Sequence, residues 1–127
     1  MRNHLGLFAS DGSVNVDRTC ALAGVDVQRA FVLFGVKQAA RAEAYPASFV
    51  AKVRDLATAL EFVAETLGGK SQAVSFWWRS PNPEFGGLSP FDLFTRKRYK
   101  TVFSFILGER QKHYRAVQLK GESPGKE

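Results

Sequence analysis

Cysteine and histidine are scarce in this chain of 127 residues, which contains one cysteine and two histidines. The single thiol, Cys20, cannot form an internal disulfide, and this favours a reducing compartment over a secreted environment. His4 and His113 lie far apart in the sequence, and with one cysteine they do not give the ligand spacing of a zinc site. We therefore expect no metal and no cofactor, and we interpret Cys20 as a small buried apolar side chain.

Long apolar runs are missing as well. No stretch approaches the roughly 18 consecutive apolar residues of a membrane span, and the first residues lack the apolar core of a secretion signal. These absences predict a cytoplasmic protein that does not contact a membrane.

The sequence also lacks the common catalytic motifs. It has no glycine-rich loop with a lysine for phosphate binding and no Gly-x-Ser-x-Gly turn for a nucleophilic serine. Glu61 and Glu65 lie one helical turn apart, but without a histidine or metal partner we interpret them as a solvated helix face. We name no catalytic residue and expect a binding protein, not an enzyme.

Phenylalanine and basic residues, by contrast, are plentiful. Eleven phenylalanines in a chain of this length predict at least one exposed apolar patch in addition to a core. The formal charge of +6 favours an anionic partner, either a nucleic acid or an acidic protein surface. The densest basic region is the run Arg96–Lys100, followed by Arg110, Lys112 and Arg115. It is either a nucleic-acid contact where Tyr99 and Tyr114 stack on bases or a solvated helix face with a tail that keeps the protein soluble.

The spacing of apolar residues predicts an all-α protein, with at least half of its residues in helices and little or no sheet. The clearest helix runs from Pro46 or Ala47 to Leu67, because apolar residues recur there at spacings of four and three. The pair Gly68-Gly69 ends this helix, since glycine readily adopts the left-handed conformation of a C-terminal cap.

Three shorter helices are expected after this one. Ser71 is the predicted cap of a helix that runs through Trp78 or Arg79. The sequence Ser89-Pro90-Phe91-Asp92 predicts a capping box that opens the next. The final helix spans about Arg98–Leu107 and ends at Gly108. Residues 46–108 would thus form one unit, followed by a flexible basic tail over residues 109–127.

The first third of the chain has a weaker pattern. Residues 1–15 show no clear period and are expected to form a partly ordered arm. Within residues 16–45, Asp17 and Asp26 are predicted caps of helices that end at Leu22 and Phe34, and a third helix is predicted over Val36–Ala44. Short helices joined by glycine-containing turns are the outline of a degenerate helix-turn-helix, or of an ordinary helical corner. If the region reads operator DNA, Gln28 and Arg29 lie at the helix start that would reach the bases.

One segment distinguishes the chain from a generic helical domain. Residues 77–94 read Trp-Trp-Arg-Ser-Pro-Asn-Pro-Glu-Phe-Gly-Gly-Leu-Ser-Pro-Phe-Asp-Leu-Phe. The corner Pro81-Asn82-Pro83 and the pair Gly86-Gly87 fix an irregular backbone, and Asn82 can bond to the neighbouring backbone. The segment therefore builds a defined corner between two helices.

This segment resembles the signature of the toxin-binding domain in the Xre/MbcA/ParS antitoxin family. The residues that fit the family pattern in order are Trp77, Pro81, Asn82, Gly86, Gly87, Ser89, Pro90, Asp92 and Leu93. With the long helix before it and the apolar residues after it, the resemblance covers about residues 47–108. Two features depart from the family: the helix-turn-helix is poorly defined, and the region after Gly108 is long and basic.

The resemblance implies an antitoxin of a type II toxin–antitoxin system. Such a protein binds a RES-domain toxin, which degrades NAD, and covers its active site; many members also bind operator DNA. By this implication the toxin contact lies near the end of the last helix. We expect the apolar residues Phe103, Phe105 and Ile106 to provide affinity, and an acidic group such as Glu109 to reach the toxin's cleft. A homo-oligomer or a hetero-oligomer with the toxin is expected. The alternatives are a DNA-binding regulator and an immunity or adaptor protein on the same scaffold.

Overall fold

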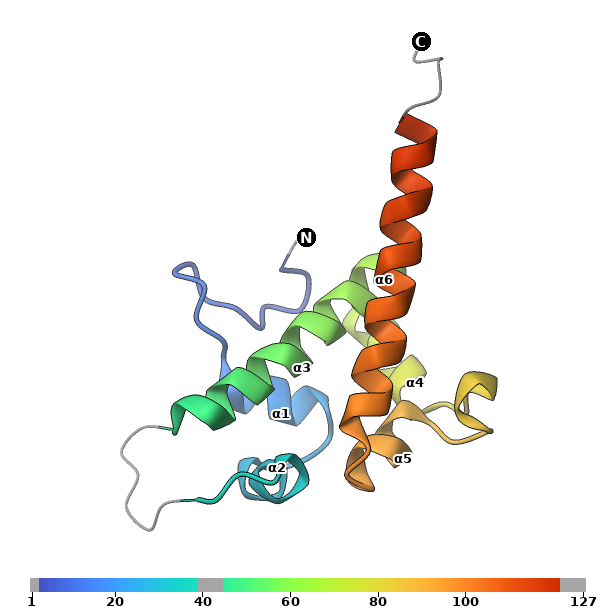
Figure 1. Cartoon of the computed structure of the whole chain (residues 1–127). Helices are drawn as coiled ribbons and strands as arrows, with labels where there is room; N and C mark the ends of the chain where they lie inside the picture. The colour runs from blue at the N-terminus through green and yellow to red at the C-terminus, as the bar shows by residue number, and fades with distance from the viewer. Residues whose placement is uncertain (1–2, 39–44, 122–127) are drawn as a thin grey trace.

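A computed structural model describes residues 3–38 and 45–121 of the chain (Figure 1). The prediction of an all-α fold is confirmed, because more than half of the residues lie in helices. Within the described ranges the only β-pairing is one isolated bridge between Phe8 and Val14. The helices are α1 (Val16–Leu22), α2 (Val27–Phe34), α3 (Ala47–Thr66), α4 (Ser71–Arg79), the short 3₁₀ helix η1 (Pro83–Phe85), α5 (Pro90–Thr95) and α6 (Tyr99–Gly121).

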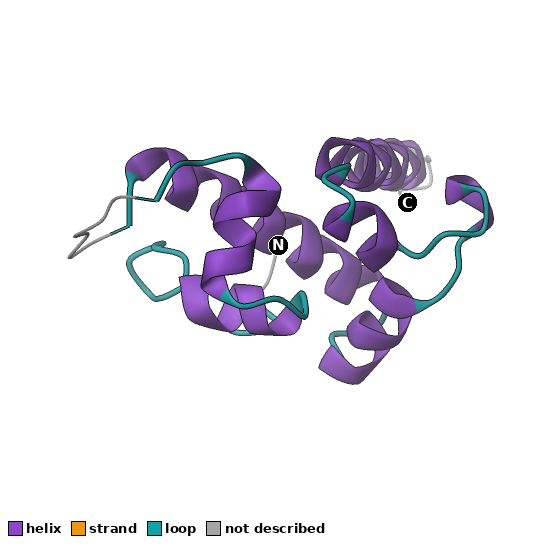
Figure 2. Ribbon diagram, turned by 90° about the horizontal axis from the view of Figure 1, so that it is seen from below, coloured by secondary structure: helices purple, strands orange, loops and turns teal. Residues whose placement is uncertain are grey.

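Helix α3 is the central element of the fold. It contacts α1 and α2 on one side and α4 and α6 on the other, while α5 packs between α4 and α6. Figure 1 shows α3 running across the molecule, with α6 standing beside its C-terminal end. In Figure 2, α6 is seen nearly along its axis, at the edge of the helical cluster. The chain therefore places its last helix on a flank of the core.

The apolar stripe on α3 explains this central position. Phe49, Val53, Leu56, Leu60 and Val63 are buried, as their spacing predicts. Leu67 is the C-terminal cap and remains partly exposed. The two glycines after it both have positive φ, so the predicted end of the helix is confirmed.

A cluster of aromatic rings joins the two halves of the molecule. Phe31 of α2 stacks on Phe49 of α3, with 3.7 Å between the ring centroids. Phe34, at the end of α2, packs edge-on against Phe94 of α5 and Tyr99 of α6, at 5.6 and 5.0 Å. Several of the plentiful phenylalanines thus form one core that spans the chain.

The first residues are better packed than the sequence indicates. Leu5 and Leu7 are buried, and their backbone amides donate to the carboxylate of Glu61 on α3. The donor–acceptor distances are 3.0 and 3.1 Å from Leu5 and 3.3 Å from Leu7. The prediction that Glu61 belongs to a solvated face is wrong, because this side chain is only 1% exposed. Its charge is instead satisfied by a segment far away in sequence.

The N-terminal helices differ from the expected three-helix outline. Asn15, and not Asp17, caps α1 by accepting from the amide of Arg18 at 2.9 Å. Asp26 caps α2 as predicted, at 2.7 Å from the amide of Arg29. Val36–Gln38 are not helical, and the rest of the predicted third helix, residues 39–44, lies outside the described residues. Residues 16–38 therefore contain two short helices, α1 and α2, with a turn between them.

Two further helix ends were placed wrongly. Helix α4 begins after Lys70 without a side-chain cap, so Ser71 is its first residue and not its cap. Helix α6 does not end at Gly108 but continues to Gly121. One glycine in a helix costs only about 1 kcal/mol relative to alanine, and residues 109–112 are good helix formers. Residues 109–121 are consequently helical and do not form a tail; residues 122–127 lie outside the described part.

Candidate protein-binding site

The segment Pro81–Leu93, which we call the corner, is built around Asn82. The Asn82 side chain accepts from the amide of Glu84 at 2.9 Å, which starts η1. Its backbone amide donates to the carbonyl of Leu88 at 3.0 Å, and its carbonyl accepts from the amide of Gly87 at 3.1 Å. One residue therefore ties both ends of the loop, as its place in the sequence predicts.

Both glycines of the corner adopt a backbone conformation that other residues resist. Gly86 has φ of 66° and Gly87 has φ of 91°. A β-carbon added at either position would meet no other atom within 4 Å. The requirement for glycine is thus purely conformational, and the expectation that this pair fixes an irregular backbone is confirmed.

Helix α5 begins with the predicted capping box. The Ser89 hydroxyl accepts from the amide of Asp92 at 2.9 Å, and the Asp92 carboxylate accepts from the amide of Ser89 at 3.0 Å. The hydrogen bond from this amide holds the pKa of the Asp92 carboxyl below its usual range. Pro90 and Leu93 are buried in the core. The corner thereby fixes where α5 starts and how it leads into α6.

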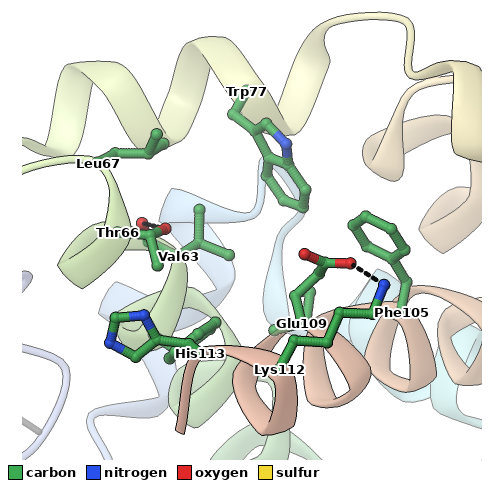
Figure 3. A pocket seen from close by; sticks show the side chains of 10 residues that line it. Val63, Thr66, Leu67, Trp77, Phe105, Glu109, Lys112 and His113 are labelled. Atoms are coloured by element: carbon green, nitrogen blue, oxygen red, sulfur yellow. Dashed lines mark hydrogen bonds and ion pairs between the residues drawn. The ribbon is translucent and has the colours of Figure 1, made fainter. Parts of the chain in front are cut away.

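The two tryptophans have different roles. Trp78 is buried, and its indole Nε1 donates to the carbonyl of Ala23 at 2.9 Å. Trp77, expected in the corner, is half-buried and lies on the wall of a groove instead (Figure 3). Trp78, and not Trp77, is the tryptophan that lies in the core.

This groove, which we call the α4 groove, lies between α3, α4 and α6 and has a volume of about 480 Å³. Figure 3 shows Trp77 of α4 facing Glu109 and Phe105 of α6 across it. The residues that line it are Phe62, Val63, Thr66, Leu67, Trp77, Phe105, Ile106, Glu109, Lys112 and His113. Apolar side chains dominate the α3 and α4 walls, and the charged side chains Glu109 and Lys112 come from α6.

Three contacts organise the α6 wall of this groove. Phe105 packs edge-on against Phe85 of the corner, with ring centroids 5.1 Å apart. Glu109 and Lys112 form an ion pair at 3.3 Å on a largely exposed surface, so it contributes little stability. His113 packs against the ring of Phe62 at 6.1 Å. A partner could therefore break or reuse the ion pair at low cost.

A second groove lies on the other flank of α6. This Arg54 groove, of about 360 Å³, is lined by Arg54, Asp55, Thr58, Ala59, Phe62, Phe103, Ile106, Leu107 and Arg110. Phe103 thus faces away from the groove that contains Phe105. Ile106 lies between them against the core and is 4% exposed.

The expected contact surface needs correction on this point. Phe103, Phe105 and Ile106 do not form one apolar face, because residues two apart on a helix point in nearly opposite directions. Ile106 is a core residue and is not accessible to a partner. Phe105 and Glu109, four residues apart, do share one face in the α4 groove.

The C-terminal part of α6 extends beyond the core (Figure 1). Residues 111–116 are all exposed, and Tyr114 is 60% exposed. Leu107, one turn before this stretch, is 53% exposed. Among the residues whose side chains are described, the last one that lines a groove is His113, and we call residues 114–121 the free end of α6.

Gln28 and Arg29, the proposed base-reading residues, are exposed in the first turn of α2. This start of α2 is the end opposite Phe34, which packs against Tyr99 of α6. Gln28 and Arg29 therefore do not form one surface with the basic run Arg96–Lys100.

Sequence reasoning missed Lys112 and His113 as groove residues because it treated residues after Gly108 as a tail. The good helix formers Glu109–Lys112, directly after Gly108, are the signal that predicts a continued helix.

Within the described ranges, no three histidine, cysteine or acidic side chains cluster in a way that would hold a metal ion. No helix among residues 3–38 and 45–121 has both the length and the apolar content to cross a membrane. No protein-family model matches the chain, and no curated protein or solved structure matches it either.

Proposed function

We propose that this protein is an antitoxin that binds a RES-domain toxin and stops it from degrading NAD. The observation that carries the proposal is the free end of α6, which leaves the core and whose residues 114–116 are exposed. The resemblance of residues 77–94 to the antitoxin signature supports the choice of partner.

The free end has a physical reason to need a partner. The exposed residues 114–116 bury little surface that could offset the backbone entropy of their helical conformation, so the core stabilises this part of α6 only weakly. Tyr114 and Leu107 also expose apolar surface along this helix. A protein that packs against α6 would bury both and stabilise the helix.

The corner supports this arrangement indirectly. Asn82, the glycine pair and the Ser89 capping box fix the backbone before α5. Leu93, buried on α5, holds the short helix that leads into α6. A rigid corner thus sets the direction in which α6 projects, which an inhibitor needs in order to present one helix to a cleft.

The α4 groove is the flank of α6 that suits a protein contact. It brings together Phe105 and Glu109, two residues expected to meet the toxin, and adds the half-buried ring of Trp77. A toxin cleft that accommodates anionic NAD should be rich in donors and cations, and Glu109 can pair with such groups. Its present partner, Lys112, is exposed and easily displaced.

A binding experiment with two matched variants tests this surface. If a RES-domain reading frame lies beside the gene for this chain, its product is the toxin to test; affinity is measured by calorimetry with purified proteins. Phe105→Asp places a charge in the α4 groove, and Phe103→Asp places the same charge on the opposite flank. We expect Phe105→Asp to weaken binding at least about tenfold, a typical effect at an interface centre, and Phe103→Asp to weaken it much less.

Circular dichroism of both variants controls for unfolding, since each aromatic ring is also packed against the core. Equal losses in two folded variants would contradict the choice of flank. No complex between the wild-type chain and the toxin would contradict the proposed function itself.

A further inference from the structure

The turn between α5 and α6 carries the highest density of positive charge in the molecule. Four of the five residues Arg96–Lys100 are basic, and all four are exposed. The ion pairs found among the described residues are His4–Glu65 and Lys112–Glu109, so none of these four cations forms an ion pair there. The charge of the Asp92 carboxylate acts on Arg96 without such a contact. We call Arg96–Lys100 the basic turn.

Packing and a hydrogen bond hold the backbone of the basic turn in place. Tyr99 is buried between Phe34 and Phe103, with ring centroids 5.0 and 5.5 Å away. The amide of Arg98 donates to the carbonyl of Leu93 at 2.8 Å. Because its backbone is anchored on both sides, the turn presents its cations from one defined place.

A fifth cation comes from another helix. The ammonium group of Lys52 on α3 lies 5.4 Å from the centre of the Tyr99 ring. The buried ring thus has one cation over it and basic neighbours on both sides, Arg98 and Lys100. The cluster combines residues that lie more than forty positions apart in the sequence.

These charges are unfavourable for the protein alone. The first turn of α6 has no acidic residue and contains Lys100. Positive charge near a helix N-terminus opposes the helix dipole, and cations close together repel each other. A bound anion would remove both costs, which gives the cluster a physical reason to bind one.

The surroundings favour a nucleic acid over an acidic protein. A protein interface usually has an apolar centre, but no large exposed apolar side chain lies in the basic turn. The exposed ones are found elsewhere in the described chain: Val32, Tyr45, Leu67, Phe76, Leu107 and Tyr114. Phosphate backbones, in contrast, are bound mainly by exposed Arg and Lys side chains.

The burial of Tyr99 favours a double-stranded over a single-stranded nucleic acid. Single strands are usually held by aromatic rings that stack on bases, and Tyr99 cannot stack in this way because its ring is in the core. The other candidate ring, Tyr114, is exposed but lies outside the basic turn. Charge without stacking suits a duplex, whose phosphates are presented on the outside.

We propose that the basic turn binds the phosphate backbone of duplex DNA without reading its sequence. This site is distinct from Gln28 and Arg29, which lie at the far end of α2. It does not depend on the proposed toxin, so either proposal can fail while the other holds.

The test measures binding of the full chain to a random-sequence DNA duplex by fluorescence anisotropy at several salt concentrations. Arg96→Gln/Arg98→Gln/Lys100→Gln removes three charges from the basic turn. Lys70→Gln/Lys112→Gln/Arg115→Gln removes three exposed charges elsewhere, so both variants lower the net charge from +6 by three. Any difference between them then reports the position of the charges and not their number.

For wild type, affinity should fall steeply between about 50 and 200 mM salt. In the basic-turn variant the slope of log K against log salt should decrease by about two to three, with an affinity loss of at least about tenfold. The control variant should lose clearly less. Arg96→Lys/Arg98→Lys should bind like wild type, since phosphate contacts depend on charge and not on the shape of the head group.

Three outcomes would overturn the proposal. Wild type does not bind the duplex, both triple variants lose affinity equally, or the basic-turn variant keeps its affinity. If the basic-turn variant still binds DNA but loses the RES-domain toxin, the turn contacts an acidic protein surface and the proposal is likewise wrong. All substituted side chains are exposed, and circular dichroism checks that the variants keep the wild-type helix content.

Discussion

The indole nitrogen of Trp78 donates a 2.9 Å hydrogen bond to the carbonyl of Ala23, and both residues are buried. The bond joins α4 to the turn between α1 and α2. The next residue reinforces it: the Arg79 guanidinium lies 4.3 Å from the centre of the Phe91 ring and in close contact with Gly24. The N-terminal helices and the corner are therefore held as one unit.

Replacing Trp78 by phenylalanine should destabilise this junction. The substitution leaves the Ala23 carbonyl buried without a donor, which costs about 1–3 kcal/mol, and it also removes packing. Trp77→Phe is the matched control, because Trp77 is half-buried on the groove wall. Urea denaturation should show a clear loss of unfolding free energy for Trp78→Phe and a smaller one for Trp77→Phe. Similar losses would show that the hydrogen bond adds little.

Glu61 should be essential for the order of the first residues. Glu61→Gln replaces a carboxylate that accepts from the Leu5 and Leu7 amides by a group with one acceptor oxygen, and we expect a loss of about 1–3 kcal/mol. Hydrogen exchange at the two amides should accelerate. Asp55→Asn, at an exposed carboxylate on the same helix, should leave both amides protected. Unchanged exchange in Glu61→Gln would mean that other contacts hold the segment.

Substitution by alanine should destabilise the protein at Gly87 and stabilise it at Gly108. Gly87 has φ of 91°, where a β-carbon costs roughly 1–2 kcal/mol, so Gly87→Ala should lower the melting temperature. Gly108 lies inside α6 with open space around a β-carbon, so Gly108→Ala should stabilise the protein by up to about 1 kcal/mol. A destabilising Gly108→Ala would contradict the continuous helix.

Cys20 should make stability depend on pH in the alkaline range. Burial, with help from Asp17 and Asp26, raises the pKa of the thiol to about 11 from its usual 9.0. The folded state therefore holds the proton more tightly than the unfolded state, and the resulting stabilisation is lost as pH rises from about 9 to 11. Denaturation in this range should show a steeper decline for wild type than for Cys20→Ala. Parallel declines would show that the thiol does not contribute.

Much of the local structure could be predicted because its causes are local. The apolar stripe of α3, the Asp26 cap and the Ser89 capping box each depend on residues within a few positions of one another. The positive φ of Gly86 and Gly87 follows from the same kind of short-range rule.

The errors concern contacts between distant segments. Glu61 has the sequence pattern of a solvated residue, and only the packing of Leu5 and Leu7 against α3 makes it buried. Gly108 was given too much weight as a helix end, and this concealed the length of α6 and the groove beside it. Phe103 and Phe105 were grouped by their position in sequence, whereas helix geometry puts them on opposite flanks.

The most direct test of the account is the NAD content of cells that express the RES-domain toxin of the binding experiment together with this chain. We predict that the full-length chain keeps NAD at the level of cells without toxin. A chain that ends at His113 keeps the residues of the α4 groove but lacks the free end of α6, and it should protect NAD only in part. If NAD falls to the same level with and without the full-length chain, the protein is not the antitoxin of this toxin and the central claim is wrong.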